Sequence, residues 1–274
     1  MQRRTVRGAL LSRIAAADRV WLMLDYDGTL TPIVAHPAHA RLSAATRRLL
    51  ARLADRSGVR VTVLSGRALR DVARRVGVRA IDYGGNHGLE WCGRRLRFRH
   101  PDAAAARPLL RRLARRLREG LRRIPGAQVE DKGLTLSVHW RTVPPSAHRV
   151  LQHAVARLTA PDRHEGRVRL TPGKRVVEIR PTVHWDKGAM VTWLWRRAAL
   201  KQRTVAVYLG DDQTDEPAFR AVNRLGGYSV VVGGTRRRTA ARHRLRDPRA
   251  VGAWLAALAR ALERSRAVKG GQDA

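Results

Sequence analysis

Two acidic clusters, far apart in the sequence, hold the residues whose types and spacing could do chemistry. The first is Asp25-Tyr26-Asp27-Gly28-Thr29, which follows the apolar run 19–24. The second is Gly210-Asp211-Asp212-Gln213-Thr214-Asp215-Glu216, which follows the apolar run 205–209. In open α/β sheets ligands collect at the carboxyl ends of the strands, so carboxylates placed there project toward one site. The two clusters therefore predict a single site made from two strand ends.

The first cluster fits hydrolysis of a phosphomonoester. That reaction needs an attacking group, an acid for the leaving alkoxide and neutralisation of the phosphate charge. Asp25 would be the nucleophile, and Asp27 the acid that later becomes the base for the water attacking the aspartyl-phosphate. Gly28 would let backbone N–H groups approach the phosphoryl oxygens. A loop with an Asx turn would explain an isolated Asp pair equally well, so the second cluster is decisive.

The second cluster predicts a Mg²⁺ site. Its acids would repel one another without a hard cation, and Mg²⁺ takes a few carboxylates while keeping water and phosphate oxygens as its other ligands. The carboxylates of Asp25 and Asp211 and the backbone carbonyl of Asp27 would hold the ion. Asp212 or Asp215 would add a direct or water-mediated ligand, and the sequence does not choose between them. Asp215 also opens a helix, where an acid is favoured by the helix dipole alone.

Two further residues would complete a phosphate site. Ser65, at the end of the apolar run 59–64, can donate its hydroxyl to a phosphoryl oxygen, and Gly66 permits close backbone approach. Lys187 precedes a helix and could hold the Asp25 carboxylate and the phosphate together as a point charge. Taken alone, the serine could equally be a helix cap and the lysine a surface cation.

Alternating strand and helix patterns position these residues. The first part of the chain predicts strands at 19–25, 59–64 and 80–83 and helices at 42–56 and 68–75. After residue 181 the same alternation predicts helix 186–199, strand 203–209, helix 214–224, strand 227–232 and helix 249–264. This order indicates an α/β, Rossmann-like core with a parallel sheet and helices on its faces.

The middle of the chain has a different pattern. Leucines at three- and four-residue steps, with Arg between them, predict a basic amphipathic helix over 103–123. Strands are expected near 128–131, 134–141, 167–171 and 174–180, and a second helix at 146–158. Lacking parallel crossovers, this series predicts an inserted α+β cap. The expected boundaries are core 1–98, cap 99–181, core 182–264 and a disordered tail at 265–274.

The composition excludes some partners. The chain has 274 residues, 44% of them hydrophobic, which is enough to bury a core. Its formal net charge of +34 would suit a polyanion. However, the basic runs 111–123 and 236–238 match no nucleic-acid module, so no specific nucleic-acid partner is expected.

The compartment is predicted from cysteine usage and hydropathy. A single cysteine, Cys92, cannot form an internal disulfide. The first residues do not match a secretory signal, and no run approaches the roughly 18 apolar residues of a membrane span. A cytoplasmic protein without a membrane partner is therefore expected.

These motifs resemble those of the haloacid-dehalogenase-like phosphatases in order and spacing. The matching segments are Asp25–Thr29, Ser65-Gly66-Arg67, Lys187 and Gly210–Asp215. Within that superfamily the chain resembles the trehalose-6-phosphate phosphatases in 85–90, 129–133, 139–141, 173–181 and 210–216.

The resemblance implies Mg²⁺-dependent hydrolysis of trehalose 6-phosphate to trehalose and phosphate, by a Rossmann-like core with a mobile cap. It also implies a functional link to a trehalose-6-phosphate synthase, although the sequence does not show whether the two proteins associate. In the cap it gives the sugar-contacting role to Glu130, Lys132, Arg141, Lys174 and Glu178. In the core, the substrate-binding residues would be Gly28, Thr29, Gly66, Arg67, Asn86 and His87, of which Asn86 and His87 could instead only shape a Gly-rich turn.

The strand expected at 174–180 supports a polar ligand independently of the resemblance. Side chains alternate along a strand, so Lys174, Glu178 and Arg180 share one face. A core strand should not turn three charges inward, so this face is expected to meet solvent or a polyol.

Two other interpretations remain open. A related cap-bearing phosphatase could act on another sugar phosphate, such as a sucrose, glucosylglycerol or mannosylglycerate precursor, and would not need Glu130, Lys132, Lys174 and Glu178. A basic polyanion-binding protein on a phosphatase fold is the other interpretation, and the full set of acids argues against it.

Overall fold

The chain forms two compact units, which we call the core unit and the cap unit. The computed structural model describes residues 2–34, 36–94, 96–173, 175–197, 204–233 and 238–270. The core unit consists of Met1–Ile33, Ala40–Arg97 and Trp185–Ala274, and the cap unit of Val34–His39 and Phe98–His184. The cap unit thus includes a short piece of chain that the sequence analysis assigned to the core. The guanidinium of Arg141 donates to the carbonyl of Val34, which ties this piece to the cap.

An eight-stranded sheet with the order β12-β11-β10-β1-β2-β3-β4-β5 forms the middle of the core unit. From β12 to β3 all neighbouring strands are parallel, and β4 runs antiparallel to β3. The strands are β1 (Arg19–Leu24), β2 (Val59–Leu64), β3 (Asp82–Gly85), β4 (Glu90–Cys92), β5 (Arg97–Arg99), β10 (Thr204–Gly210), β11 (Tyr228–Val232) and β12 (His243–Leu245).

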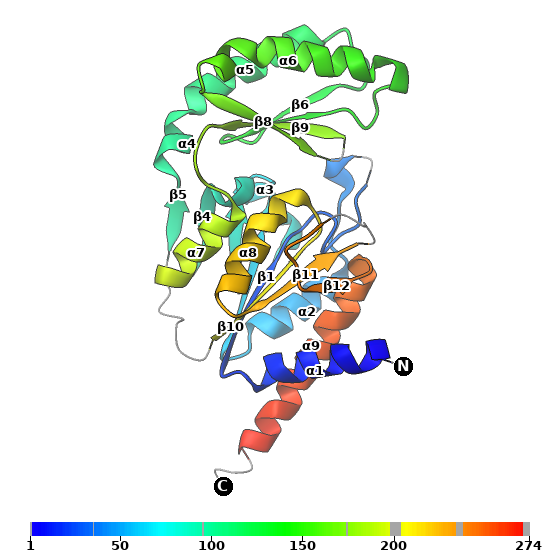
Figure 1. Cartoon of the computed structure of the whole chain (residues 1–274), viewed down its shortest axis with the longest axis vertical. Helices are drawn as coiled ribbons and strands as arrows, with labels where there is room; N and C mark the ends of the chain where they lie inside the picture. Colours follow the sequence, from blue (N-terminus) through cyan, green and yellow to red (C-terminus); the bar gives the residue numbers. More distant parts are fainter. Residues whose placement is uncertain are drawn as a thin grey trace. The chain divides into compact units, whose positions relative to one another are not determined.

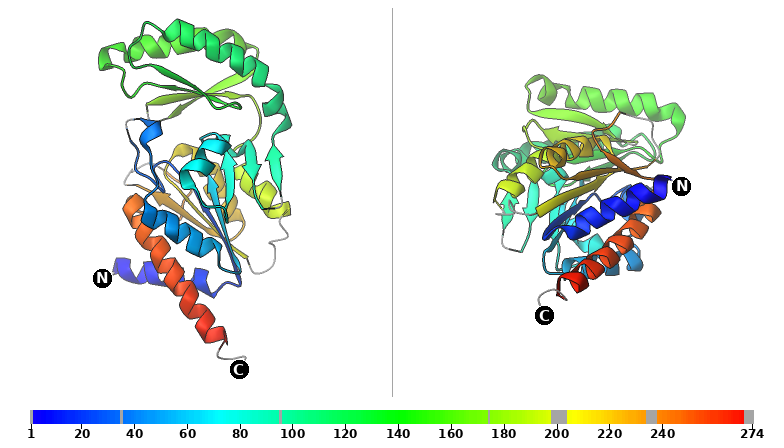
Figure 2. Two further views of the ribbon diagram at one scale, coloured as in Figure 1. Left: turned by 180° about the vertical axis from the view of Figure 1, so that it is seen from behind. Right: turned by 60° about the horizontal axis from the view of Figure 1, so that its bottom comes forward.

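Helices cover both faces of this sheet, which confirms the predicted α/β class. Helices α7 and α8 pack on each other on the face turned toward the viewer in Figure 1. The view from behind in Figure 2 has α1, α2 and α9 in front of the sheet. The helices of the core unit are α1 (Gln2–Ala16), α2 (Ala44–Ala54), α3 (Leu69–Val76), α7 (Lys187–Arg197), α8 (Glu216–Arg224) and α9 (Pro248–Gly270), with short 3-10 turns η2 (Asn86–Gly88) and η4 (Gln213–Asp215).

Strand β1 lies in the interior of the sheet because its sequence is apolar on both faces. Residues 20–24 are each no more than 2% exposed, as expected of a parallel strand covered by helices on both sides. The pairing register aligns Leu24 with Leu209 of β10 and with Val63 of β2. The carboxyl ends of these three strands therefore meet at one edge of the sheet.

The cap unit is a four-stranded antiparallel sheet covered by helices on one face. Its strand order is β6-β7-β9-β8. Leucines of α5 pack with Leu136, Val138 and Ile179 in a continuous apolar core. The strands are β6 (Gln128–Asp131), β7 (Leu136–His139), β8 (Val168–Gly173) and β9 (Val176–Pro181), and the helices are α4 (Pro101–Ala105), α5 (Arg107–Leu121) and α6 (His148–His164), with 3-10 turns η1 (Pro37–His39) and η3 (Pro145–Ala147).

Some elements differ from the expected ones. The single helix predicted over 103–123 is two helices, because the chain turns at Ala106 and a new helix begins at Arg107, with Pro108 in its first turn, where its missing N–H is not needed. Helix α9 continues to Gly270 rather than ending at 264, since no Gly or Pro interrupts 265–269. The tail was expected to be disordered from 265, but it is helical as far as Gly270, and residues 271–274 lie outside the described residues.

No helix among the described residues has the length and apolar character needed to cross a membrane.

Candidate active site

The candidate active site lies at the carboxyl edge of the core sheet, where three strand ends meet. Asp25 follows β1 and donates its backbone N–H to the carbonyl of Leu209, 2.9 Å away. Ser65 follows β2 and is fixed by its backbone N–H to the carbonyl of Gly84. Asp211 follows β10. All three side chains are buried, between 1% and 9% exposed, so the sheet brings the two acidic clusters and the serine motif to one place.

Lys187 connects the two acidic clusters. It is the first residue of α7 and is 1% exposed, and its Nζ lies 2.6 Å from Oδ1 of Asp25 and 2.6 Å from Oδ1 of Asp215. Burial acts to lower the pKa of Lys187, but the charges of Asp215 and Asp25 outweigh it and hold the pKa well above its usual value. The lysine is therefore a buried ammonium that fixes the orientation of Asp25.

Asp215 organises the turn after β10. One of its oxygens accepts from the Tyr208 hydroxyl at 2.7 Å as well as from Lys187, and the other accepts the backbone N–H groups of Asp211 and Asp212 at 3.0 Å. Burial tends to raise the pKa of Asp215, yet Lys187 and these donors lower it overall. Asp215 is thus held ionised by contacts that occupy both of its oxygens.

For Asp25 the influences on the pKa have the opposite net effect. Burial, the largest influence, raises its pKa; Lys187 lowers it, and the nearby carboxylates of Asp215 and Asp211 raise it again. The net result is a pKa well above the usual value, because Asp25 is buried, shares the Lys187 ammonium with Asp215 and lies near Asp211. The site therefore carries an excess of negative charge.

A divalent cation fits this excess. Asp25, Asp211 and Asp215 each offer a carboxylate oxygen within 4.8 Å of the others, and all three are buried. Hard oxygen donors of this kind suit Mg²⁺ or a similar ion. Asp25 and Asp211 are better suited as direct ligands than Asp215, whose oxygens are occupied. Asp212 lies outside this group; it caps η4, with its carboxylate accepting from the backbone N–H of Gln213 at 2.7 Å.

Gly28 lets the backbone beside Asp27 come close to Asp211. Its φ of +84° is left-handed, and a Cβ at this position would lie 2.2 Å from Oδ2 of Asp211. Any other residue would be strained and would also collide with that carboxylate.

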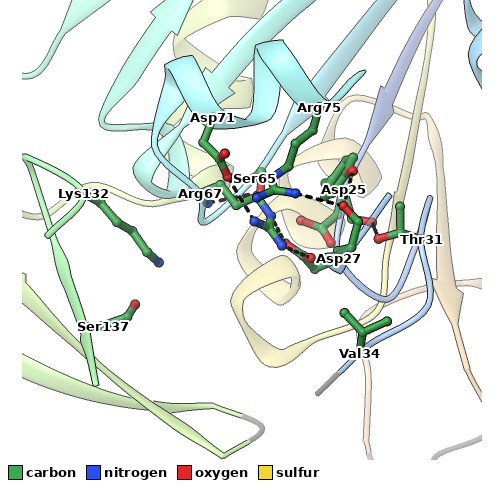
Figure 3. A network of polar contacts seen from close by, with 12 residues as sticks. Asp25, Asp27, Thr31, Val34, Ser65, Arg67, Asp71, Arg75, Lys132 and Ser137 are labelled. Atoms are coloured by element: carbon green, nitrogen blue, oxygen red, sulfur yellow. Dashed lines mark hydrogen bonds and ion pairs between the residues drawn. The ribbon is translucent and has the colours of Figure 1, made fainter. Parts of the chain in front are cut away.

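Arg67 forms an ion pair with Asp27. The guanidinium donates from Nε and Nη2 to the two oxygens of Asp27, both at 2.7 Å, and from Nη1 to Asp71 at 3.0 Å (Figure 3). It also lies over the ring of Tyr26, 5.3 Å from its centroid. Arg67 was expected to bind substrate, and its ion pair with Asp27 was not predicted from the sequence.

Two hydroxyls and a glycine lie beside these residues. Ser65 is 1% exposed, and its Oγ accepts the backbone N–H of Arg67 at 3.1 Å. The Oγ1 of Thr29 is fully buried and has no hydrogen-bond partner among the described residues. A Cβ on Gly66 would lie 2.5 Å from the ring of His87, so this turn is closely packed.

Asn86 and His87 contact the Ser65–Arg67 segment through backbone hydrogen bonds. Asn86 donates its N–H to the carbonyl of Arg67, and His87 donates to that of Ser65. Both have positive φ, 48° and 58°, and the amide of Asn86 donates to Glu90 at 2.7 Å. They therefore shape the loop that carries the serine motif.

The described members of the proposed sugar-contacting set each have a polar partner within the cap unit. Lys132 Nζ lies 2.9 Å from Oε1 of Glu178, and the ring of His139 lies 2.8 Å from Glu130. Arg141 binds the carbonyl of Val34. Lys174 lies outside the described residues.

The described charged residues of β9 are buried from solvent, one of the two environments expected for this face; contact with a polyol, the other, stays a prediction. Glu178 and Arg180 are 8% and 6% exposed. Glu178 can be buried because Lys132 reaches it from the β6–β7 turn, and a paired carboxylate loses less on leaving water than an isolated one.

Several residues of this site were not predicted from the sequence. Tyr208 was not singled out, nor were Asp71 and Arg75, which extend the Arg67 contacts, and Glu90 was named only as the end of the segment 85–90. The available signal for Asp71 was its position four residues after Arg67, a spacing that lets opposite charges pair near a helix.

The fold belongs to a known class. A haloacid dehalogenase-like hydrolase from Bacteroides thetaiotaomicron superposes with a TM-score of 0.58 at 15% identity, over 90% of this chain and 99% of the other. The C. albicans trehalose-6-phosphate phosphatase C-terminal domain superposes with a TM-score of 0.81 at 26% identity, over 92% and 96%. The core and cap units therefore have the haloacid-dehalogenase-like phosphatase fold.

Sequence comparisons define the family within this class. The model of the trehalose-phosphatase family matches residues 23–249, so the chain belongs to that family. A trehalose-phosphate phosphatase of Mycolicibacterium paratuberculosis is 43% identical over 205 residues, 73% of this chain and 51% of the other. The Mycobacterium tuberculosis (strain H37Rv) protein of that name is 40% identical over 247 residues, 88% and 61%. The chain thus spans only about half of the first relative's length and about three fifths of the second's.

Proposed function

We propose that the chain is a Mg²⁺-dependent phosphomonoesterase that hydrolyses trehalose 6-phosphate to trehalose and phosphate through an aspartyl-phosphate. The observation that carries the proposal is the buried group of Asp25, Asp211 and Asp215 at the carboxyl edge of the sheet, in which Asp25 and Asp215 pair with Lys187. The family and its named relatives support the substrate.

In the first step a carboxylate oxygen of Asp25 forms a bond to phosphorus, and the bond from phosphorus to the sugar oxygen breaks. Asp27 gives its proton to the departing sugar oxygen. Lys187 fixes the attacking carboxylate by the 2.6 Å contact to its Oδ1. The products of this step are free trehalose and phosphorylated Asp25.

In the second step Asp27, now a carboxylate, takes a proton from water, and the water oxygen attacks phosphorus. The bond between phosphorus and the Asp25 oxygen breaks, which releases phosphate and restores both aspartates. In the structure both oxygens of Asp27 accept from Arg67, which fixes the plane of the side chain that takes part in both proton transfers.

Several core residues would hold the phosphoryl group. We assign its oxygens to the hydroxyls of Ser65 and Thr29 and to the backbone N–H groups around Gly28 and Gly66, with Arg67, Asn86 and His87 shaping the same pocket. The buried, partner-free hydroxyl of Thr29 supports this assignment.

The Mg²⁺ ion would be held by the carboxylates of Asp25 and Asp211 and the backbone carbonyl of Asp27, with Asp212 and Asp215 around them. When bound it neutralises charge on the phosphoryl oxygens.

In the cap unit we assign recognition of the sugar hydroxyls to Glu130, Lys132, Arg141, Lys174 and Glu178. Paired carboxylates and ammonium groups can exchange a partner for a vicinal hydroxyl, which is the chemistry a disaccharide presents. A trehalose-6-phosphate synthase would supply the substrate. The one cysteine, Cys92, is free, in keeping with a reducing setting such as the cytoplasm.

The test is phosphate release from a panel of trehalose 6-phosphate, sucrose 6-phosphate and glucose 6-phosphate, with and without EDTA. We expect release from trehalose 6-phosphate that needs the metal and is absent from Asp25→Asn. Equal rates on all three esters would refute the assigned substrate. A salt-sensitive affinity for polyanions without any hydrolysis would replace the proposal with a binding function.

A further inference from the structure

Arg67 joins two carboxylates of the core unit. It meets Asp27 through two parallel hydrogen bonds of 2.7 Å and Asp71 through one of 3.0 Å (Figure 3). A fork of this kind fixes the plane of the carboxylate that it binds, as well as its distance. Burial acts to lower the pKa of Arg67, but both carboxylates raise it, so the guanidinium stays charged.

Asp71 is anchored to its own helix. It lies in the first turn of α3 and accepts from Nε of Arg75 at 2.8 Å and from Nη2 of Arg74 at 3.1 Å. Arg75 in turn donates to the carbonyl of Ala40 at 3.0 Å. Burial tends to raise the pKa of Asp71, yet hydrogen bonds from Arg75 and Arg67 lower it overall, so Asp71 is a fixed negative charge behind Arg67.

Asp27 is more exposed than either residue that supports it. The side chain of Asp27 is 40% exposed, that of Asp71 20%, and that of Arg67 only 8%. A half-exposed carboxylate has no packing of its own to select a rotamer. It therefore takes its orientation from the buried guanidinium, which also donates to Asp71.

From this chain of contacts we infer that Asp71 is a positioning residue for the proton-transferring Asp27 and acts through Arg67. The inference rests on the proposed function, since it concerns the residue to which that function gives acid and base roles. No motif of the sequence includes Asp71. Its removal leaves Arg67 without its second partner, so that the guanidinium can shift and turn Asp27 away from the sugar oxygen.

The first test is the Asp71→Asn variant, assayed on trehalose 6-phosphate. The asparagine keeps the size and one acceptor but removes the charge that anchors Arg67. We expect kcat to fall about 10- to 100-fold, the range for a slightly misplaced catalytic group, with KM within about twofold of wild type. Asp71→Glu, which restores the charge, should recover most of the loss.

A substrate whose leaving group needs no proton distinguishes misplacement of Asp27 from general damage to the active site. p-Nitrophenolate departs without a proton, so formation of the aspartyl-phosphate from p-nitrophenyl phosphate does not need Asp27 as an acid. The rapid-mixing burst of p-nitrophenol should therefore keep its rate in Asp71→Asn while turnover of trehalose 6-phosphate falls. A burst slowed by the same factor would show damage to the nucleophile and overturn the inference.

A double-mutant cycle provides the second test. If Asp71 acts only through Asp27, then Asp27→Asn/Asp71→Asn should be no slower than Asp27→Asn alone. Losses that multiply would mean that Asp71 acts elsewhere, and would overturn the inference.

The matched control is Arg74→Gln. Arg74 also pairs with Asp71, but its side chain is 79% exposed and lies on the solvent side, so kcat should stay at the wild-type value.

Thermal unfolding shows whether each variant is folded. Should Asp71→Asn not fold, Arg75→Gln removes a support of Asp71 and should give a smaller loss of the same kind. Wild-type kcat in a folded Asp71 variant overturns this inference, whereas a wild-type protein inactive on every sugar phosphate refutes the proposed function itself.

Discussion

Lys187 and Asp25 form a buried ion pair, with Nζ 2.6 Å from Oδ1, and the same ammonium lies 2.6 Å from Asp215. A compact ammonium can serve two carboxylates in a narrow space, whereas the wide, planar guanidinium of arginine cannot take its place without displacing them. The chain contains 56 Lys and Arg residues, yet lysine occurs only at positions 132, 174, 187, 201 and 269. Lysine at position 187 is therefore an exception to a strong compositional preference for arginine.

Replacing Lys187 should lower activity severely, even when the replacement is arginine. In Lys187→Arg the larger head group would displace Asp25, and kcat should fall by about 100-fold or more. In Lys187→Met the buried carboxylates lose their counter-charge, which should lower the free energy of unfolding by about 3–5 kcal/mol. Steady-state kinetics and urea unfolding of both variants measure these effects. Wild-type kcat in Lys187→Arg would contradict the role given to the ammonium.

The acid cluster predicts stabilisation by Mg²⁺ that can be measured without substrate. An ion that binds only the folded state adds about 2.7 kcal/mol at a concentration 100 times its Kd, so Mg²⁺ should raise the unfolding temperature and EDTA should reverse the rise. Asp211→Asn should lose this shift, because it removes a carboxylate of the cluster.

Asp212→Asn is the matched control for that measurement, since its carboxylate is bound to the N–H of Gln213. It should keep most of the Mg²⁺-dependent shift. The reverse pattern, with the shift lost in Asp212→Asn and kept in Asp211→Asn, would assign the ion to a different set of ligands.

Gly28 should tolerate no side chain. In Gly28→Ala the left-handed backbone alone costs about 1–2 kcal/mol, and the new Cβ would also collide with Asp211. Gly226→Ala is the control, because its φ of +71° gives similar strain with no atom within 4 Å of the added Cβ. We expect both variants to be less stable by urea unfolding, but only Gly28→Ala to lose Mg²⁺-dependent stabilisation and activity. Equal activity of the two variants would contradict the close approach of this backbone to Asp211.

The sequence was sufficient to predict the elements that position the site. Strand β1 is a run of apolar residues bounded by Asp25, and β2 was predicted with its observed bounds because Val59–Leu64 ends at Ser65-Gly66. Strands β4, β5 and β12 were missed, because three residues are too few to show a period. The N-terminal helix α1 was also missed, since no proline, glycine or acidic cap marks its beginning.

The contacts between side chains were less predictable. Ser65, Asp25 and Asp211 follow strand ends, and the parallel register alone brings them together. The pairing of Arg67 with Asp27 depends on the path of the loop between β2 and α3, to which Asn86 of η2 and Glu90 of β4 contribute hydrogen bonds. Such a path is set by tertiary contacts, so periodicity and spacing cannot reveal it. The burial of Glu178 was missed for the same reason, because Lys132 comes from a different part of the chain.

The pair of Lys132 and Glu178 in the cap unit predicts a selective loss of sugar recognition. Lys132→Gln removes the ammonium 2.9 Å from a carboxylate that is 8% exposed, so Glu178 loses its counter-charge and its fixed orientation. KM for trehalose 6-phosphate should rise about 10-fold or more, roughly the effect of losing one hydrogen bond to a charged group. Turnover of p-nitrophenyl phosphate, which has no sugar, should not change. Arg169→Gln, at an exposed position of β8, is the control and should leave both substrates unaffected. Loss of both activities in Lys132→Gln would show that the pair supports folding of the cap and would remove the argument for its role in recognition.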